Sequence, residues 1–143
     1  MPDGTAPDFA ALLAFRTALR RFNRWSEDQA RAVGLTHAQH QLLLCIKGHD
    51  DPRGPTIGEA AAYLLLRHHS AVELTNRAQT GGLVERTRDD TDARVVRLKL
   101  TPLGEERLEA LTQLHVNELK QLAPLLRHVI PSDGADLQHG PLG

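Results

Sequence analysis

The chain of 143 residues has the usual size of one domain, and 41% of its residues are hydrophobic whereas only 3% are aromatic. This composition predicts a core of Leu, Val and Ala, which suits helices. The formal net charge of −1 excludes the general basic excess that many nucleic-acid-binding domains carry, so a positive surface would have to come from segregated charges.

The sequence gives no sign of a membrane or secreted protein. No apolar run approaches the length of about 18 residues that a membrane-spanning helix needs. The first residues, Met-Pro-Asp-Gly-Thr, lack the basic patch and apolar stretch of a secretory signal. The single Cys45 leaves no partner for an internal disulfide and fits a reducing compartment. We therefore expect a cytoplasmic protein without a membrane partner.

The first predicted helix follows a lead, residues 1–7, that contains prolines and a glycine. Asp8 is placed to cap this helix by accepting from its exposed backbone N–H groups, and Gly34 ends it. Apolar residues recur at spacings of three and four and mark one face: Leu12, Phe15, Leu19, Phe22 and, extending it, Trp25.

Two capping boxes predict the starts of a second and a third helix. Thr36 with Gln39 and Thr56 with Glu59 can each satisfy two exposed backbone donors reciprocally. A turn-rich break over 48–55 separates the two helices. The expected buried stripe of the second helix is Ala38, Leu42, Cys45 and Ile46, and that of the third is Ile57, Ala60, Ala61 and Leu64.

A fourth helix is predicted after Leu65 and Leu66, and it ends at Gly81-Gly82, where left-handed backbone angles are tolerated. Its inward positions are Ala71, Leu74, Thr75 and Ala78. The opposite face carries His69, Val72, Glu73 and Asn76, with Ser70 and Arg77 on its flanks.

Residues 83–100 form two short strand patterns around a charged turn, which predicts a hairpin. Thr101-Pro102 then marks the start of a long amphipathic helix that Pro124 is expected to kink. A hairpin cannot bury its apolar face alone and must lean on the helices before it. The order helix, helix, hairpin therefore predicts a mainly α fold with a small β-hairpin wing, a winged helix-turn-helix.

Five sequence segments, in this order and spacing, resemble the multiple-antibiotic-resistance regulator (MarR) family. They are Leu35-Thr36-x-x-Gln39, Thr56-Ile57-Gly58-Glu59-Ala60-Ala61, Gly82-Leu83-Val84-Glu85-Arg86, Asp89-x-x-Asp92-x-Arg94 and Leu98-x-Leu100-Thr101-x-x-Gly104. The resemblance covers roughly residues 8–130.

The resemblance implies a homodimeric regulator of transcription whose first and last helices interlock. The fourth helix would enter the major groove of DNA and the wing tip the adjacent minor groove. In many members a small, often aromatic or phenolic, anion binds between scaffold and DNA-binding lobe and releases the DNA. The chain would thus comprise a flexible lead (1–7), a first dimerisation helix (8–34), a winged helix-turn-helix lobe (35–100), a C-terminal dimerisation helix (101–130) and a polar, frayed tail (131–143).

The sequence departs from the family pattern in three places. Leu65 stands where a glycine is common in the turn between the two helix-turn-helix helices, and Ala78 stands where a large aliphatic residue is common. The usual final helix is replaced by Pro131-Ser132-Asp133-Gly134 and a polar tail, so a smaller dimer scaffold is expected.

Candidate DNA-reading residues lie on the fourth helix and the wing. Asn76 could pair bidentately with adenine, Val72 touch a thymine methyl, and Glu73 accept from cytosine. On the wing, Arg94 is the candidate minor-groove residue, oriented by Asp92. The remaining candidates contact phosphates or sit at the start of the helix, where anions are favoured: Arg67, His68, His69, Ser70, Arg77 and Arg88. The alternative for the helix residues is an ordinary solvated face that binds no ligand. The alternative for the wing residues is a turn whose role is purely structural.

Effector, metal and redox sites find weaker support. An effector pocket is expected near Trp25, His37 and His40, unless Trp25 simply packs in the core. Cys45 falls on an apolar stripe, where a thiol is poorly reactive. Without a second cysteine or a carboxylate pair at ligand spacing, the eight histidines do not predict a metal site, and no cofactor is expected.

The sequence therefore predicts a homodimeric repressor that binds a pseudo-palindromic double-stranded operator and answers to a small-molecule effector. No phosphate-binding loop or nucleophile motif predicts an enzyme. Two rival hypotheses remain: a winged-helix protein that mediates protein contacts, which the neutral charge and acidic wing favour, and a regulator switched by metal or redox chemistry.

Overall fold

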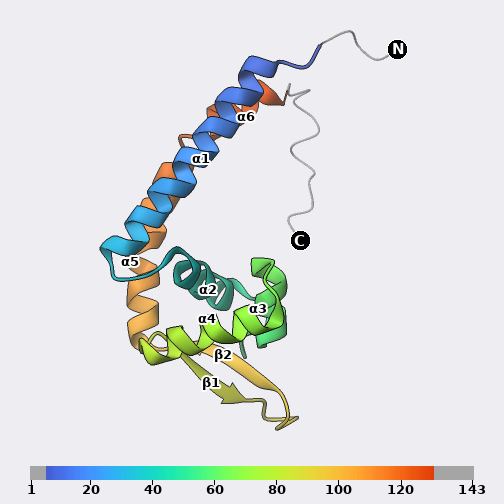
Figure 1. Ribbon diagram of the computed structural model, residues 1–143, viewed down its shortest axis with the longest axis vertical. Coiled ribbons are helices and arrows are strands. Elements are labelled where there is room, and N and C mark those ends of the chain that lie inside the picture. Colours follow the sequence, from blue (N-terminus) through green and yellow to red (C-terminus); the bar gives the residue numbers. More distant parts are fainter. Residues whose placement is uncertain (1–5, 131–143) are drawn as a thin grey trace. The chain divides into compact units, whose positions relative to one another are not determined.

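The computed structural model describes residues 6–130, which form two compact units (Figure 1). We call residues 6–26 with 114–130 the terminal unit, and residues 27–113 the central unit. Helices α1 (Phe9–Ala32) and α5 (Pro102–Leu119) contribute residues to both. The outer part of the expected lead, the expected tail and the Pro131 departure lie outside the described residues. No helix within residues 6–130 combines the length and apolar character needed to cross a membrane.

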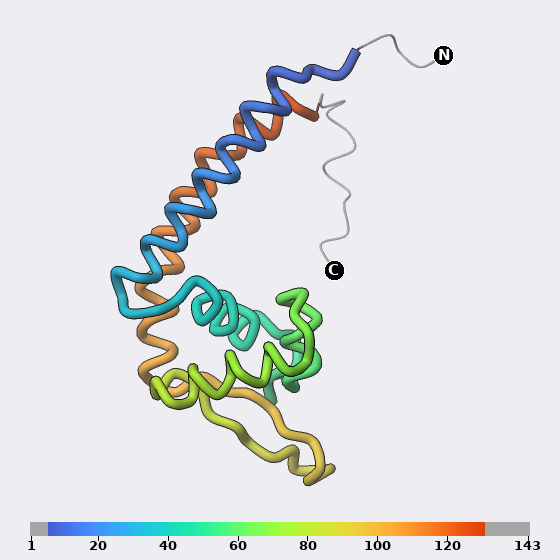
Figure 2. The backbone as a smooth tube through the Cα atoms, viewed as in Figure 1, coloured from blue at the N-terminus to red at the C-terminus, as the bar shows by residue number. Residues whose placement is uncertain are grey.

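The central unit has the predicted order of helices and hairpin. Helices α2 (His37–Gly48), α3 (Ile57–Leu64) and α4 (His68–Thr80) precede strands β1 (Val84–Arg88) and β2 (Val96–Leu100), and the tube in Figure 2 shows the hairpin leaving the end of α4. Both predicted capping boxes form, at Thr36–Gln39 and at Thr56–Glu59. In each, the threonine hydroxyl accepts from the backbone N–H three residues on, and the Gln or Glu side chain accepts from the backbone N–H of the threonine. The fold class is therefore confirmed: mainly α, with one antiparallel hairpin.

The hairpin is fastened to the segment before α3. Strands β1 and β2 pair antiparallel, with Val84 opposite Leu100 and Arg88 opposite Val96. The backbone N–H of Leu98 donates to the carbonyl of Pro55 at 2.8 Å. Gly54 makes this approach possible, because its φ is +90° and a Cβ there would lie 2.0 Å from the Leu98 carbonyl oxygen.

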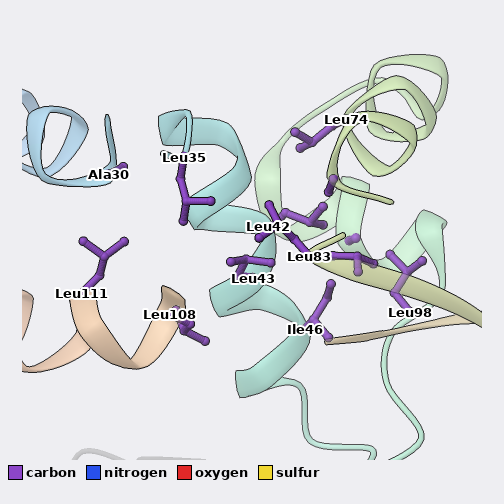
Figure 3. Close-up of a cluster of buried hydrophobic side chains, with 13 residues drawn as sticks. Ala30, Leu35, Leu42, Leu43, Ile46, Leu74, Leu83, Leu98, Leu108 and Leu111 are labelled. Carbon is purple, nitrogen blue, oxygen red and sulfur yellow. The ribbon is translucent and has the colours of Figure 1, made fainter. Parts of the chain in front are cut away.

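The core of the central unit is aliphatic, as the composition predicts. Leu42 and Leu43 of α2 lie among side chains from the hairpin and from α5 (Figure 3). The predicted stripe of α2 was partly wrong: Ala38 is exposed and Cys45 is only half-buried, whereas His40 and Leu43 are buried. The predicted inward residues of α4 are all buried: Ala71, Leu74, Thr75 and Ala78.

The last long helix is broken rather than kinked. Helix α5 ends at Leu119, and a separate α6 (Ala123–Val129) begins with Pro124 in its first turn, where the missing N–H and fixed φ of proline are tolerated. Before the break, Leu108 and Leu111 join the core of the central unit. In the terminal unit α6 lies beside α1 (Figures 1 and 2), and residues from both helices line one cavity.

Leu65 takes the backbone conformation that the family commonly assigns to glycine. It is the C-cap of α3 with φ 55° and ψ 40°, and among residues 6–130 no other non-glycine residue has a positive φ. Its side chain gains little from burial, because Leu65 is 92% exposed. The turn therefore holds its shape against the steric cost of a Cβ in the left-handed region.

Replacing Leu65 by glycine should stabilise the protein by about 0.5–1 kcal/mol, because relief of the left-handed strain outweighs the larger conformational freedom of glycine in the unfolded chain. Leu65→Ala is the matched control, since it removes the same side chain and keeps the Cβ, and we expect it to stay within about 0.5 kcal/mol of the wild type. Urea denaturation measures both. A glycine variant less stable than the alanine variant would show that the turn is not strained.

Candidate nucleic-acid interface

The outer face of α4 is open to solvent in the central unit. His69, Glu73 and Asn76 are exposed, and Val72 is partly exposed. Of the predicted candidates at the start and flanks of the helix, Arg67, His68 and Arg77 are exposed and Ser70 is partly buried. The face is therefore sterically free to contact another molecule.

The start of α4 differs from those of α2 and α3 in its caps. Arg67 occupies the N-cap position but makes no side-chain hydrogen bond to the backbone N–H groups of the first turn. No acidic residue stands in that turn. These donors and the positive end of the helix dipole are thus left to water or to an external anion.

Arg86 on β1 joins the wing to the far half of α4. Its Nη2 donates to Oδ1 of Asn76 at 2.6 Å, and its Nη1 donates to Oε1 of Gln79. Arg86 was not among the predicted site residues. The sequence offers no local signal for it, because its partners lie seven and ten residues away on a different element.

At the wing tip, Asp92 holds Arg94 as predicted. The Arg94 backbone N–H and Nε both donate to Oδ1 of Asp92, at 3.0 and 3.1 Å, and Nη2 donates to Oδ2 at 3.1 Å. These bonds lower the pKa of the Asp92 carboxyl, through the Arg94 side chain first and its backbone second. The Arg94 side chain is nevertheless 91% exposed. Arg88, the second wing candidate, donates to the carbonyl of Ala93 at 2.9 Å and so closes the turn.

The base of the wing rests on a network of Asp51, Arg53, Asp89 and Arg97. Asp89, whose side chain is 4% exposed, accepts from Nε of Arg97 at 3.0 Å and lies 3.4 Å from Nη1 of Arg53. Nη2 of Arg53 also donates to Asp51 at 2.8 Å, and Nη1 of Arg97 donates to the Gly54 carbonyl at 2.9 Å. The network therefore links the loop between α2 and α3 to strand β2 and to Asp89, the residue that follows β1.

Hydrogen bonds lower the pKa of both carboxyls in this network. The backbone N–H of Thr91 is the largest cause of the lowered pKa of Asp89, which is about 2, and Arg97 adds to it. Side-chain and backbone bonds from Arg53 hold the pKa of Asp51 well below its ordinary value. Asp51, Asp89 and Asp92 are thus ionised at neutral pH and paired with arginines. The wing is less acidic toward a partner than its sequence suggests.

Positive and negative charges are segregated between the two units, but the excess of positive charge does not lie on the central unit. Residues 27–113 contain slightly more Asp and Glu than Lys and Arg. The described part of the terminal unit instead holds a basic excess: Arg16, Arg20, Arg21, Arg24, Lys120 and Arg127 against Asp8 and Glu118. A nucleic acid at α4 would therefore meet individually placed arginines rather than a broadly positive surface.

The expected effector residues belong to different units. Trp25 packs in the terminal unit against His115 and Phe22, with ring centroids 4.9 and 5.9 Å away, and it lines a cavity of about 290 Å³. His37 and His40 belong to α2 in the central unit, where His40 is buried. The effector pocket therefore stays a prediction.

Cys45 and the histidines gain no sensor role from the geometry. Burial, with a smaller effect of Glu59, raises the pKa of the Cys45 thiol to about 11, so very little thiolate exists at neutral pH. Across residues 6–130, no three His, Cys, Asp or Glu side chains are grouped as metal ligands would be.

An open helix face, a wing with a held arginine and the preceding two-helix turn define a winged helix-turn-helix protein. Residues 33–95 match the model of the MarR family. This match and the relatives below support the resemblance of the chain to the MarR family that its sequence indicated.

Similar proteins share the fold and are described as regulators of transcription. A Bacillus subtilis protein described as an uncharacterized HTH-type transcriptional regulator, YsmB, is 44% identical over 50 residues, a stretch that spans 35% of this chain and only about a third (34%) of the relative. A crystal structure of a MarR family transcription regulator is 26% identical with a TM-score of 0.64, covering 85% of this chain and 76% of that one.

The chain also resembles a protein solved with DNA. A cysteine-to-serine mutant of Escherichia coli MarR, complexed with operator DNA, is 22% identical with a TM-score of 0.64, and the match covers 91% of this chain and 89% of that one. At this identity the likeness concerns the fold. The relatives are described as transcription regulators, which agrees with the expectation that the chain is not an enzyme.

Asp89→Asn should destabilise the protein at neutral pH, because it removes the charge between Arg53 and Arg97. The folded-state pKa of Asp89, about 2, lies below its unfolded value of about 4. Its contribution is therefore fully present above the unfolded pKa and is lost as the pH falls through the folded pKa. Thermal melting should show a gap between wild type and variant that is widest above about pH 5 and narrows toward pH 2.

Asp90→Asn is the matched control for this measurement, because Asp90 is exposed and neighbours Asp89 in the same turn. We expect it to melt like the wild type at every pH. A constant gap between wild type and Asp89→Asn across the pH range would mean that the ionised carboxylate does not stabilise the wing.

Proposed function

We propose that the chain is a sequence-specific regulator of transcription that binds a double-stranded, pseudo-palindromic operator as a homodimer. Helix α4 lies in the major groove in this proposal, and the wing tip reaches the neighbouring minor groove. The role is that of a repressor in the cytoplasm. The match of residues 33–95 to the MarR family model and the DNA complex of a protein with a similar fold support the proposal.

One observation carries this proposal: the wing tip presents an almost fully exposed guanidinium that is already held in position. Asp92 binds Nε and Nη2 of Arg94, so the side chain gives up less rotamer freedom on binding than a free arginine would. Three N–H bonds, two on Nη1 and one on Nη2, remain for acceptors such as phosphate or minor-groove base edges.

The pairing of the wing carboxylates also weakens the rival protein-contact hypothesis. That hypothesis rests partly on an acidic wing, yet Asp89 is buried between arginines and Asp92 is bound to Arg94. Local repulsion of phosphates by these residues is reduced accordingly. Arg67, His68 and His69, at the uncapped start of α4, are the phosphate contacts in this proposal.

Exposed apolar side chains support self-association through the terminal unit. Single exposed apolar residues are ordinary, but so many large ones within so small a unit are unusual for a monomer. These exposed residues of the terminal unit are Phe9, Leu12, Leu13, Leu114, Val116, Leu119, Leu126 and Ile130. We propose that a second copy covers them, so that residues 8–34 and 101–130 act as dimerisation helices.

Release by a small aromatic or phenolic anion completes the proposal. Trp25 and Phe22 supply aromatic surface beside the cavity of the terminal unit, and Arg21 at the same cavity supplies a cation. His37 and His40 remain further candidates on α2. An effector that prefers dimers with splayed lobes would draw the population away from DNA.

Gel-shift titration against the DNA upstream of the protein's own gene tests the proposal directly. We expect a specific complex that survives competition by unrelated DNA, with an affinity that falls as salt rises. The absence of a specific complex at low salt would contradict the proposal and support the protein-contact hypothesis instead.

Arg94→Ala should weaken operator binding by about 1–3 kcal/mol. The number of counterions released on binding, which the slope of affinity against salt concentration gives, should fall by about one. The loss should be similar across operator variants if Arg94 contacts the backbone. Arg31→Ala is the matched control, because Arg31 is an exposed arginine paired with Glu27 on α1, outside the hairpin, and its removal should leave affinity unchanged. Equal affinities of wild type and Arg94→Ala would remove the wing tip from the site.

Leu13→Glu should convert the dimer into a monomer, because it places a charge among the exposed apolar residues that the second copy would cover in this proposal. Leu13 is 64% exposed in the single chain, so the substitution should leave the fold intact. Leu44→Glu is the matched control: Leu44 is 50% exposed on α2 of the central unit, and its variant should remain dimeric. Sedimentation equilibrium distinguishes the outcomes, and a monomeric wild type would contradict the proposed dimer.

A further inference from the structure

We propose that Arg86 determines which base Asn76 reads, by fixing the orientation of the Asn76 side-chain amide. This inference rests on the proposed function, since it concerns sequence readout by α4. It makes Arg86 a positioning residue for specificity and not only a cation of the wing. It also replaces the expected pairing of Asn76 with adenine by a pairing with guanine.

The chemistry of arginine settles how the Asn76 amide is turned. A guanidinium carries only donors, so the group facing Nη2 at 2.6 Å must be the oxygen Oδ1 and not the NH₂ group. The same reasoning applies to Gln79, whose Oε1 accepts from Nη1 of Arg86. One planar fork thus binds two amide oxygens from the same exposed face of α4.

The orientation of the amides sets what they offer to a base pair. With Oδ1 of Asn76 turned to Arg86 and one of its two lone pairs engaged there, the two N–H bonds of Nδ2 are the groups that the amide can direct to a base. Bidentate pairing with adenine needs the oxygen to accept from N6 while the nitrogen donates to N7. Guanine instead presents two neighbouring acceptors, O6 and N7, to the major groove. An amide whose oxygen is held by Arg86 and whose NH₂ group meets the base therefore favours guanine over adenine.

Arg86 is suited to this role because its fork is rigid. Two parallel donors in one plane can hold both amides at once, whereas the single ammonium of a lysine on a flexible stem cannot reproduce that geometry. Lysine does keep the positive charge near the DNA backbone. Arg86→Lys therefore separates amide orientation from simple attraction to phosphate.

Competition gel shifts with the full-length protein test the inference, using operator duplexes in which each base pair is changed singly. The pair read by Asn76 is the one at which Asn76→Ala abolishes discrimination. At that pair we expect the wild type to prefer guanine to adenine by roughly tenfold. Arg86→Lys should lose or reverse this preference and keep the preferences at all other pairs. In the Asn76→Ala background, Arg86→Lys should cause no further change in base preference.

Lys99→Gln is the control for charge, because Lys99 is an exposed cation on the other strand of the same hairpin, and its removal should leave every base preference intact. Thermal melting of Arg86→Lys checks that the wing stays folded. An unchanged guanine preference in Arg86→Lys, a uniform loss of binding to all duplexes, or a wild-type preference for adenine at this pair would each overturn the inference. Absence of any specific complex with the wild type would instead count against the proposed function.

Discussion

The backbone hydrogen bond from Leu98 to Pro55 is the contact on which the proposed interface depends. A two-stranded hairpin is marginal in water by itself, and this bond gives β2 a second neighbour on its other edge. Leu98 is fully buried beside it, and Gly54 lets the two backbones meet. Arg86 and Arg94 both project from this hairpin, so their positions relative to α4 follow from how β2 is seated.

The ion-pair network at the wing base acts on the same attachment through side chains. Asp89 and Arg97 are nearly buried, and each has further partners in the loop between α2 and α3. A buried ion pair is not by itself evidence of high stability, because desolvation offsets much of the attraction. Its defined geometry does, however, favour one seating of the hairpin. Apolar contact at Leu98 and the polar network thus select the same position of the wing.

Local signals in the sequence were enough for the elements of the fold. Capping boxes at Thr36 and Thr56, the spacing of Ala71 to Ala78, and the Thr101-Pro102 start all predicted features that the structure confirms. Each depends on neighbours within a few residues. The break after Leu119 was underestimated, because Pro124 predicted a kink and the helix stops before it.

The candidate site was predictable only where its contacts are local. The Asp92–Arg94 pair spans two residues, and the sequence pattern alone suggested it. Arg53 and Asp89 are 36 residues apart, and as sequence they resemble ordinary loop charges. Burial also escaped the pattern on α2, where Ala38 has the expected periodicity but His40 occupies the core. Long-range pairing needs the tertiary fold before it becomes visible.

The slight acidic excess of the central unit has a consequence for how an operator would be found. Attraction to phosphates that is independent of sequence is what lets a protein slide along random DNA, and it grows with the number of cations on the contacting face. Because the net positive excess within residues 6–130 lies on the terminal unit and not on the unit that carries α4, this protein would stay on non-cognate DNA only briefly. Its search would proceed by repeated encounters from solution, and less of it would be sequestered by the bulk of the chromosome.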